Sequence, residues 1–147
     1  MTPTRASIRR ELRIHHPAEE VWALVGDPTR LHEWFPGVTA CEVDGDTRVI
    51  TTGSGIPMPE QLLTIDPLQR RFQYRITAPL FNEHLGTIDV IDLGDRTSLV
   101  VYSTDADPAT LALVIGGAMG QALFRLRDLL EGTAPHCSPH TQAPDGR

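Results

Sequence analysis

The sequence contains no lysine, and all thirteen of its Lys and Arg positions are arginine. This absence excludes a lysine Schiff base, and with it aldolase-type covalent catalysis and the anchoring of pyridoxal phosphate. The net charge of −6 leaves no positive surplus for a nucleic acid, because phosphate contacts need clustered positive charge. Arg9, Arg10 and Arg13 lie close together, but Glu11 interrupts them, and this pattern is typical of a solvated strand face.

Cysteine is nearly absent as well, since Cys41 and Cys137 are the two in the chain. Cys137 falls in residues 133–147, a Pro-, Thr- and His-rich stretch that we expect to be a disordered tail, so no disulfide is predicted. His136 and His140 flank this cysteine, but no second ligand cluster would close a tetrahedral metal site. The chain also lacks a Gly-rich phosphate loop and a Gly-x-Ser-x-Gly sequence. We therefore expect no metal, no cofactor and no esterase nucleophile.

Long apolar runs are missing too, because none approaches the roughly 18 residues that span a bilayer, and this predicts no membrane insertion. The segment from Met1 to Arg13 is polar and lacks the apolar core of a signal peptide, so we expect a cytoplasmic protein. With 147 residues, 40% hydrophobic and 22% charged, the chain has the size and composition of one globular domain. We predict that this domain occupies residues 1–132.

The chain does contain a series of short strand patterns. Residues 7–14 alternate, with Ile8, Leu12 and Ile14 on one side and charged side chains on the other. Short turns separate six further segments, and this spacing favours an antiparallel sheet over a parallel one. Seven strands are predicted in all, and the later six cover residues 38–43, 47–52, 60–65, 71–77, 84–93 and 97–104.

Two short helices are predicted between the first and second strands. Residues 18–25 carry an apolar face, and Pro17 stands where a first helical turn accepts proline. The second helix would be capped by Asp27 and would run to about Glu33.

A long helix from Asp107 to Glu131 follows the strands. Asp107 would cap it, Pro108 would occupy its first position, and it would span roughly 36 Å across the whole sheet. Each of the glycines at positions 116, 117 and 120 costs up to about 1 kcal/mol in a helix. They indicate either close packing on the sheet or a widened ligand cavity. The apolar stripe consists of Leu111, Ile115, Ala118, Ala122, Leu126 and Leu129, with Gln121, Arg125 and Asp128 opposite.

Two stretches resemble the opening of bacterial START-like proteins: PAEEVWALVGDP at residues 17–28 and LHEWFPGV at residues 31–38. More narrowly, they are similar to the polyketide cyclase/dehydrase family of the SRPBCC superfamily. The segments RFQYRI at 71–76 and HLGTI at 84–88 fit the strand pattern of that family. The resemblance covers about residues 5 to 131. It implies the α+β helix-grip fold, in which a curved seven-stranded antiparallel sheet grips a long C-terminal helix around a hydrophobic pocket.

The lining of such a pocket can be predicted from strand parity and helix spacing. Phe72, Tyr74 and Ile76 share one face of their strand, and His84 shares a face with Ile88 on the next. The aromatic pair before the Pro-Gly turn would lie at the pocket mouth, where it would stack on a flat ligand or plug the core. The residues expected to contact a ligand are Trp34, Phe35, Glu60, Phe72, Tyr74, Ile76, His84, Ile88, Leu111, Ile115, Ala118, Met119 and Ala122.

Three of these side chains are candidates for acid/base catalysis: Glu60, His84 and Tyr74. The resemblance places a recurrent glutamate at Glu60, which would either act with a raised pKa or simply pair with an arginine. His84 would shuttle protons near neutral pH or serve as a hydrogen-bonded structural residue. Tyr74 and Tyr102 would each offer a hydroxyl to a ligand or occupy the core or the surface.

The function must be argued from the pocket, because the superfamily places cyclases, lipid carriers, hormone receptors and co-chaperones on one scaffold. We expect a protein that binds a hydrophobic or aromatic small molecule of lipid or polyketide type. One alternative is a metal-free polyketide aromatase/cyclase that uses the three candidate side chains for aldol closure and dehydration. Another is a protein-partner module such as a co-chaperone or an antitoxin, which needs an exposed apolar patch. The predicted outer side of the long helix shows no such patch.

Overall fold

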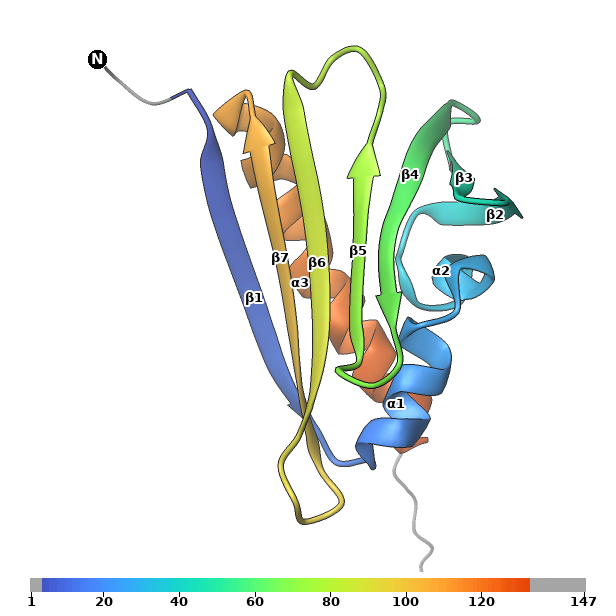
Figure 1. Ribbon diagram of the computed structural model, residues 1–147, viewed down its shortest axis with the longest axis vertical. Helices are drawn as coiled ribbons and strands as arrows, with labels where there is room; N and C mark the ends of the chain where they lie inside the picture. The colour runs from blue at the N-terminus through green and yellow to red at the C-terminus, as the bar shows by residue number, and fades with distance from the viewer. Residues whose placement is uncertain (1–3, 133–147) are drawn as a thin grey trace, which may run out of the picture.

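A seven-stranded antiparallel sheet forms the body of the fold in the computed structural model, which describes residues 4–132 (Figure 1). The strands are β1 (Ala6–Ile14), β2 (Val38–Asp44), β3 (Thr47–Thr52), β4 (Pro57–Asp66), β5 (Arg71–Ile76), β6 (Glu83–Asp92) and β7 (Ser98–Asp107). Their order is β1-β7-β6-β5-β4-β3-β2, so successive hairpins build the sheet and β1 joins its far edge beside β7. The predicted number and direction of the strands are confirmed.

One strand begins earlier than its sequence pattern indicates. Residues 53–59 are expected to form a loop, but β4 starts at Pro57 and pairs with β3 through both Pro57 and Pro59. On its other side β5 ends at Ile76, which is the register partner of Glu60. The two prolines therefore lie where β4 has a complete strand partner on one side only, and there a missing N–H is tolerated.

Two short helical segments connect β1 to β2. They are α1 (Ala18–Val25) and α2 (Leu31–Trp34), with the 3-10 turn η1 (Pro28–Arg30) between them. The carboxylate of Asp27 accepts hydrogen bonds from the backbone N–H of Thr29 at 3.0 Å and from the Thr29 hydroxyl at 2.6 Å. The two predicted short helices are confirmed, and Asp27 caps a helical start as predicted, but the second helix is divided into the 3-10 turn η1, which Asp27 caps, and α2.

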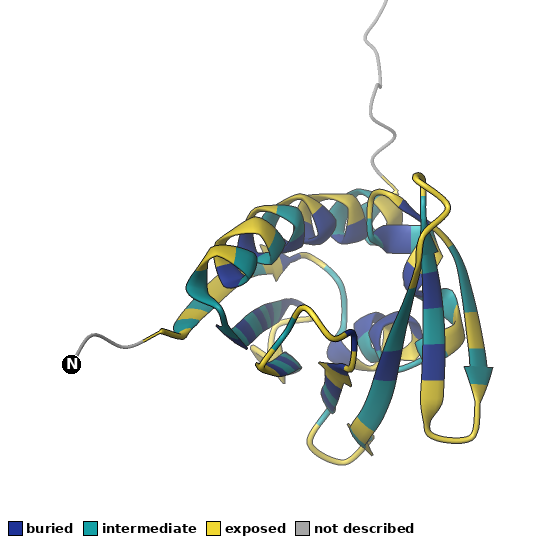
Figure 2. Ribbon diagram, turned by 90° about the horizontal axis from the view of Figure 1, so that it is seen from above, coloured by how far each residue is buried: buried dark blue, intermediate teal, exposed yellow. Residues whose placement is uncertain are grey.

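The long helix α3 (Ala109–Glu131) lies across the concave side of the sheet and packs on β1 and β7 (Figures 1 and 2). Its 23 residues span about 34 Å. The prediction of its first turn is wrong, because Pro108 is the N-cap and Asp107 is the last residue of β7, paired with Glu83 on β6. The strand continues past the predicted limit at Thr104, so Asp107 is not available as a cap.

The apolar stripe of α3 serves two purposes that the sequence pattern does not separate. Near its C-terminal end the helix packs directly in the core, where Ala122 and Leu126 are fully buried. Near its N-terminal end Leu111, Ile115 and Ala118 border a cavity. Leu129, the last member of the predicted stripe, is instead 49% exposed. The fully buried side consists of Ala112, Gly116, Met119, Ala122, Leu123 and Leu126.

The helix glycines reflect close packing at one position. A Cβ placed on Gly116 would lie 2.8 Å from Cγ2 of Ile8 on β1, which is closer than real Cβ contacts. A Cβ on Gly120 would meet Arg10 at an ordinary 3.8 Å, and one on Gly117 would meet nothing within 4 Å. None of the three glycines borders the cavity. Of the two predicted reasons for these glycines, close helix-on-sheet contact therefore applies, and it applies to Gly116.

The outer side of α3 is more apolar than expected. Leu113, Val114 and Phe124 are 60%, 71% and 45% exposed, whereas the sequence pattern predicts no exposed apolar patch on this side. An 18-residue window of the helix also reaches a mean hydropathy of 1.4, so by length and composition α3 would pass as a membrane span, whereas the sequence analysis expected no apolar run of about that length. In the fold, however, α3 packs on the sheet and buries Met119 and Leu126 completely.

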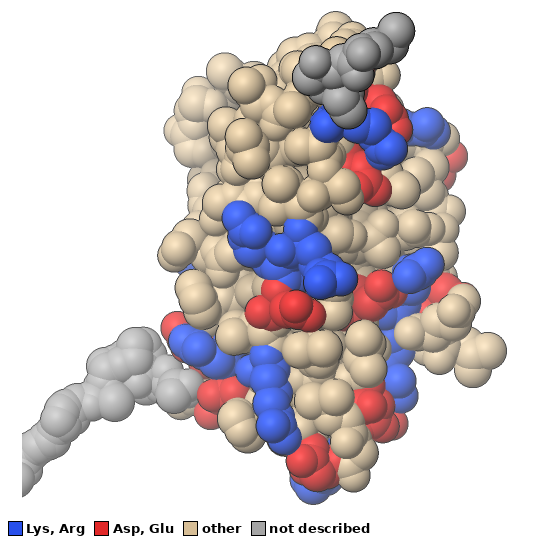
Figure 3. Space-filling model, turned by 90° about the vertical axis from the view of Figure 1, so that its left-hand side faces the viewer, with Lys and Arg blue, Asp and Glu red and all other residues tan. Residues whose placement is uncertain are grey.

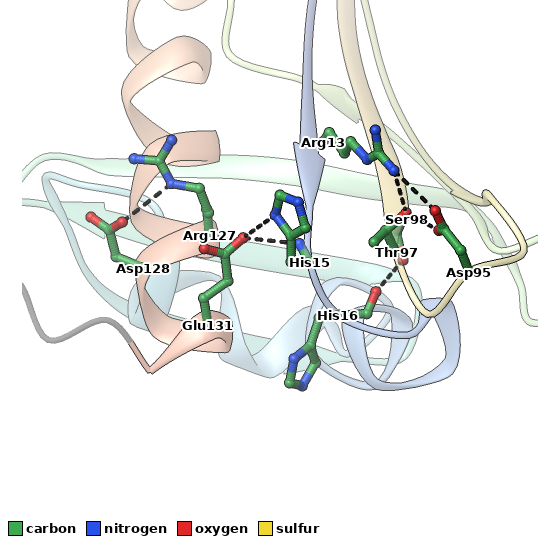
Figure 4. Close-up of polar contacts among 9 residues, drawn as sticks. All are labelled: Arg13, His15, His16, Asp95, Thr97, Ser98, Arg127, Asp128 and Glu131. Atoms are coloured by element: carbon green, nitrogen blue, oxygen red, sulfur yellow. Dashed lines mark hydrogen bonds and ion pairs between the residues drawn. The ribbon is translucent and has the colours of Figure 1, made fainter.

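Polar contacts hold the end of α3 against the junction between β1 and α1 (Figure 4). Oε2 of Glu131 accepts a hydrogen bond from the backbone N–H of His15 at 2.9 Å. Oγ of Ser98, at the start of β7, donates to the carbonyl of His16 at 2.7 Å. These bonds satisfy backbone groups at the point where the chain leaves the sheet, so they fix the direction in which α1 begins.

Charges of both signs cover the edge of the sheet formed by β1. Arg9, Arg10 and Arg13 are exposed, as predicted for a solvated strand face. Arg13 forms an ion pair of 3.1 Å with Asp95, and acidic groups are interspersed with arginines on this side of the molecule (Figure 3).

Candidate ligand-binding site

A cavity of about 450 Å³ lies between the N-terminal part of α3 and the sheet. Its volume is within the range of about 300–1,000 Å³ that is typical of small-molecule sites. The wall is formed by α2, the β2–β5 strands, β7, α3 and the loop that joins β5 to β6. Leu80 on that loop and Val114 on α3 are 53% and 71% exposed, so they mark the side on which the cavity opens to solvent.

The wall is apolar except for five side chains. Thr52 and Ser54 lie near the surface, and their hydroxyls bond to each other at 2.8 Å. Glu60, Tyr74 and Tyr102 are 3%, 5% and 1% exposed, so they form the polar interior of the cavity. A ligand would therefore meet an apolar surface over most of its area and three polar groups at one place.

Glu60 is held by a buried arginine on the neighbouring strand. Arg48 on β3 is its direct register partner, and the side chains of both residues are almost completely buried. Nε and Nη2 of Arg48 each lie 2.7 Å from the same oxygen, Oε1 of Glu60. Burial raises the pKa of Glu60, and the nearby guanidinium opposes this rise. Glu60 therefore pairs with an arginine, which is the structural alternative for it, and it also lines the cavity.

Arg48 is additionally enclosed by aromatic rings and a carbonyl. Its Cζ lies 5.3 Å from the ring centroids of both Phe72 and Tyr74, and Nη1 donates to the carbonyl of Pro28 at 3.3 Å. These contacts compensate the burial of the guanidinium without exposing it to the cavity. The sequence pattern does not predict Arg48 as a partner of Glu60, because hairpin pairing of segments 47–52 and 60–65 would place Thr52 opposite Glu60. The earlier start of β4 at Pro57 shifts the register and brings Arg48 opposite Glu60.

The two tyrosines form a second polar pair. The hydroxyl oxygens of Tyr74 on β5 and Tyr102 on β7 are 2.6 Å apart, so one hydroxyl donates to the other. Burial raises the pKa of both phenols, so both remain neutral. The sequence pattern leaves Tyr102 either as a hydrogen-bonding group for a ligand or as a core or surface residue, and it is not among the predicted contact residues. It was missed as a cavity residue because Leu99 and Val101, on the opposite parity of the strand, are also apolar.

His84 lies behind Tyr74, outside the cavity wall. Its Nδ1 accepts a hydrogen bond from the backbone N–H of Ile76 at 3.0 Å, which assigns the proton of the neutral ring to Nε2. Nε2 then donates to Oγ1 of Thr104 at 3.1 Å. Burial lowers the pKa of His84 to about 4, against the opposing charge of Asp105. The imidazole is thus neutral at physiological pH with both nitrogens bonded, which matches the structural role weighed for it.

The residues predicted to contact a ligand are divided between the cavity wall and the core. Phe35, Glu60, Tyr74, Ile76, Leu111, Ile115 and Ala118 line the cavity. Trp34, Phe72, His84, Ile88, Met119 and Ala122 are buried beside or beneath it, so Trp34 does not lie at the mouth. The wall also contains residues that strand parity and helix spacing do not predict, among them Met58, Leu80, Phe81, Tyr102 and Val114.

Within residues 4–132, no three His, Cys, Asp or Glu side chains are grouped closely enough to hold a metal ion. The His and Cys positions near residue 137 and the predicted tail lie outside the described part of the chain.

Together, the curved antiparallel sheet, the long C-terminal helix and the two short helices after the first strand define a START-like helix-grip protein. Residues 5–131 match the family described as polyketide cyclase/dehydrase and lipid transport, and the chain belongs to that family. The resemblance drawn from its motifs is confirmed.

Solved structures show the same fold at low sequence identity. The protein XoxI from Bacillus cereus is 23% identical, with a TM-score of 0.81 over 90% of this chain and 99% of that one. Norcoclaurine synthase from Thalictrum flavum, solved with dopamine and hydroxybenzaldehyde, is 18% identical, with a TM-score of 0.69 over 88% of each chain. A START superfamily protein from Mycobacterium smegmatis is 11% identical, with a TM-score of 0.73 over 86% of this chain and 97% of that one. No curated protein sequence matches the chain.

Proposed function

We propose that the protein binds an apolar or aromatic small molecule, of lipid or polyketide type, in the cavity between α3 and the sheet. The observation that carries this proposal is the combination of a cavity of about 450 Å³ with a mostly apolar wall. Membership of a family whose description includes lipid transport supports it, as does the aromatic character of the compounds bound to norcoclaurine synthase.

Titration with N-phenyl-1-naphthylamine, a neutral apolar dye that fluoresces when it leaves water, tests this proposal. Ala118 lines the cavity, so Ala118→Phe should fill part of it and weaken dye binding at least about tenfold. Leu113 is exposed on the same helix and lies outside the wall, so Leu113→Phe is the matched control and should bind as the wild type does. Equal binding by the wild type and Ala118→Phe would place the dye elsewhere and refute the proposal.

A polyketide cyclase is the second candidate, because Glu60 and Tyr74 lie in the cavity wall together. In such an enzyme the Glu60 carboxylate would remove a proton from a methylene between two carbonyls. The new carbanion would then attack a distant carbonyl of the same chain, and a tyrosine hydroxyl would hydrogen-bond the oxygen that gains charge. The carbon–carbon bond closes the ring, the alkoxide takes back the proton held by Glu60, and loss of water would then give the unsaturated ring.

This candidate is tested with a synthetic poly-β-keto thioester. Glu60→Gln should abolish cyclisation while the variant still binds the naphthylamine dye. Unchanged turnover in Glu60→Gln would exclude Glu60 as the base, and absence of turnover in the wild type would leave a binding protein.

A further inference from the structure

The carboxylate of Glu60 is satisfied on one oxygen only. Both contacts from Arg48, at 2.7 Å each, go to Oε1. Within the described part of the chain, no backbone or side-chain group donates a hydrogen bond to Oε2. Glu60 is 3% exposed and lines the cavity, so this oxygen is shielded from bulk water and has no protein donor. A carboxylate oxygen in that position is an acceptor that a ligand can complete.

The adjacent tyrosine pair offers the complementary group. Two hydroxyls carry two hydrogens, and the 2.6 Å contact between Tyr74 and Tyr102 uses one of them. No acceptor among residues 4–132 takes the second hydrogen. Tyr74 is the register partner of Leu62 on β4, so it lies diagonally across from Glu60, two residues along the same strand. One free acceptor and one free donor therefore lie close together in the cavity.

The cavity wall contains an acidic side chain and no basic one. None of the residues that form the wall is an arginine or a histidine, and the guanidinium of Arg48 lies behind Glu60 with its charge already paired. An anionic head group would be buried beside a carboxylate without a free cation, which is unfavourable in a mostly apolar site. A neutral ligand avoids this repulsion.

We propose that the cavity selects uncharged ligands that carry a hydroxyl group on an apolar or aromatic frame, and that it rejects free carboxylates such as fatty acids. The ligand hydroxyl donates its hydrogen to Oε2 of Glu60, and its oxygen accepts the free hydrogen of the tyrosine pair. A hydroxyl fits because it both donates and accepts, whereas an ammonium group has no acceptor. This inference rests on the proposed ligand-binding function and adds the chemical class of the ligand.

Four probes on one aromatic frame test the inference at pH 7 by isothermal titration calorimetry: 2-naphthol, 2-methoxynaphthalene, naphthalene and 2-naphthoate. The expected order places 2-naphthol at least about tenfold tighter than its methyl ether, because a hydrogen bond to a carboxylate is among the strong ones. The methyl ether keeps the oxygen but loses the donor, so it isolates the contact with Glu60. 2-Naphthoate should bind more weakly than naphthalene itself.

Two double variants test whether the preference for 2-naphthol over its methyl ether depends on the Arg48–Glu60 pair. Arg48→Met with Glu60→Leu removes the buried pair together, because removal of one partner alone would leave a buried charge. This variant should bind 2-naphthol and its methyl ether equally. Arg71→Met with Asp89→Leu removes a cross-strand arginine–carboxylate pair of 2.8 Å on β5 and β6, away from the cavity, and should keep the wild-type preference.

The outcomes separate the two proposals. Equal affinity of the wild type for 2-naphthol and 2-methoxynaphthalene, or tightest binding of 2-naphthoate, would overturn the hydroxyl inference and leave the cavity as a general apolar site. Failure of all four probes and of the naphthylamine dye to bind would overturn both. The ligand series uses the wild-type protein, so it decides the inference even if the double variant at the cavity does not fold.

Discussion

The buried imidazole of His84 should make the stability of the protein fall with pH in a defined window. In the folded state its pKa is lowered from 6.5 to about 4, mainly by burial against the rings of Tyr74 and Phe81 at 5.5 and 5.3 Å. The unfolded chain binds a proton near pH 6.5, and the folded chain resists protonation until about pH 4. Stability contributed by the neutral ring is therefore complete above pH 6.5 and is lost as the pH falls through about 4.

The size of this loss of stability follows from the change in the pKa of His84 on folding. The difference between 6.5 and about 4 corresponds to a loss of up to about 3 kcal/mol, at about 1.4 kcal/mol for each pKa unit. His84→Asn supplies the comparison, because its amide oxygen can accept the Ile76 N–H as Nδ1 does, yet the amide does not titrate. The variant loses the bond to Thr104, so it should be less stable than the wild type at pH 7.

Urea unfolding of both proteins at pH 7, 6, 5 and 4 measures the difference. Carboxylates titrate in both proteins, so their contribution cancels in the difference between the two unfolding free energies. The contribution of His84 remains. The stability gap between the wild type and His84→Asn should narrow by up to about 3 kcal/mol between pH 7 and pH 4. Parallel stability curves across this range would refute the argument that the imidazole is buried in its neutral form.

Two further predictions concern packing and the buried ion pair. Gly116→Ala should destabilise the fold by about 1 kcal/mol or more, because its Cβ would press on Ile8 at 2.8 Å, whereas Gly117→Ala should stabilise it by up to about 1 kcal/mol, since nothing lies within 4 Å. Thermal unfolding measures both, and equal effects would contradict the proposed helix-on-sheet contact. Arg48→Met alone should cost about 3–5 kcal/mol, because the Glu60 carboxylate would remain buried without its cation, and adding Glu60→Leu should recover much of the loss. A double variant no more stable than Arg48→Met in urea unfolding would show that the pair is net stabilising.

Much of the architecture is readable from local patterns. Strand alternation, turns at hairpin spacing and the capping carboxylate of Asp27 are properties of neighbouring residues, so they predict the element order and most limits. The inward face of β5 can also be predicted from neighbouring residues, because Phe72, Tyr74 and Ile76 alternate with polar residues. Where both faces of a strand are apolar, as around Tyr102, periodicity does not choose between them and only packing does.

The composition of the site depended on contacts between distant residues. Arg48 meets Glu60 through the register of β3 and β4, and Tyr102 meets Tyr74 although they are 28 residues apart and on strands that are not neighbours in the sheet. His84 was a reasonable candidate from its parity, but the backbone N–H of Ile76 occupies its acceptor. Such partners are set by side-chain geometry across the sheet and do not follow from spacing along the chain.

The sequence by itself determined the order of the elements, the antiparallel sheet, the family resemblance and the presence of an apolar long helix. Only the tertiary structure decided which part of that helix packs in the core and which part borders a cavity. It also placed a half-satisfied carboxylate and a tyrosine pair together in that cavity. The physical reason is range: periodicity and turn chemistry act over a few residues, whereas cavity shape and burial depend on how closely α3 and the sheet approach at each point.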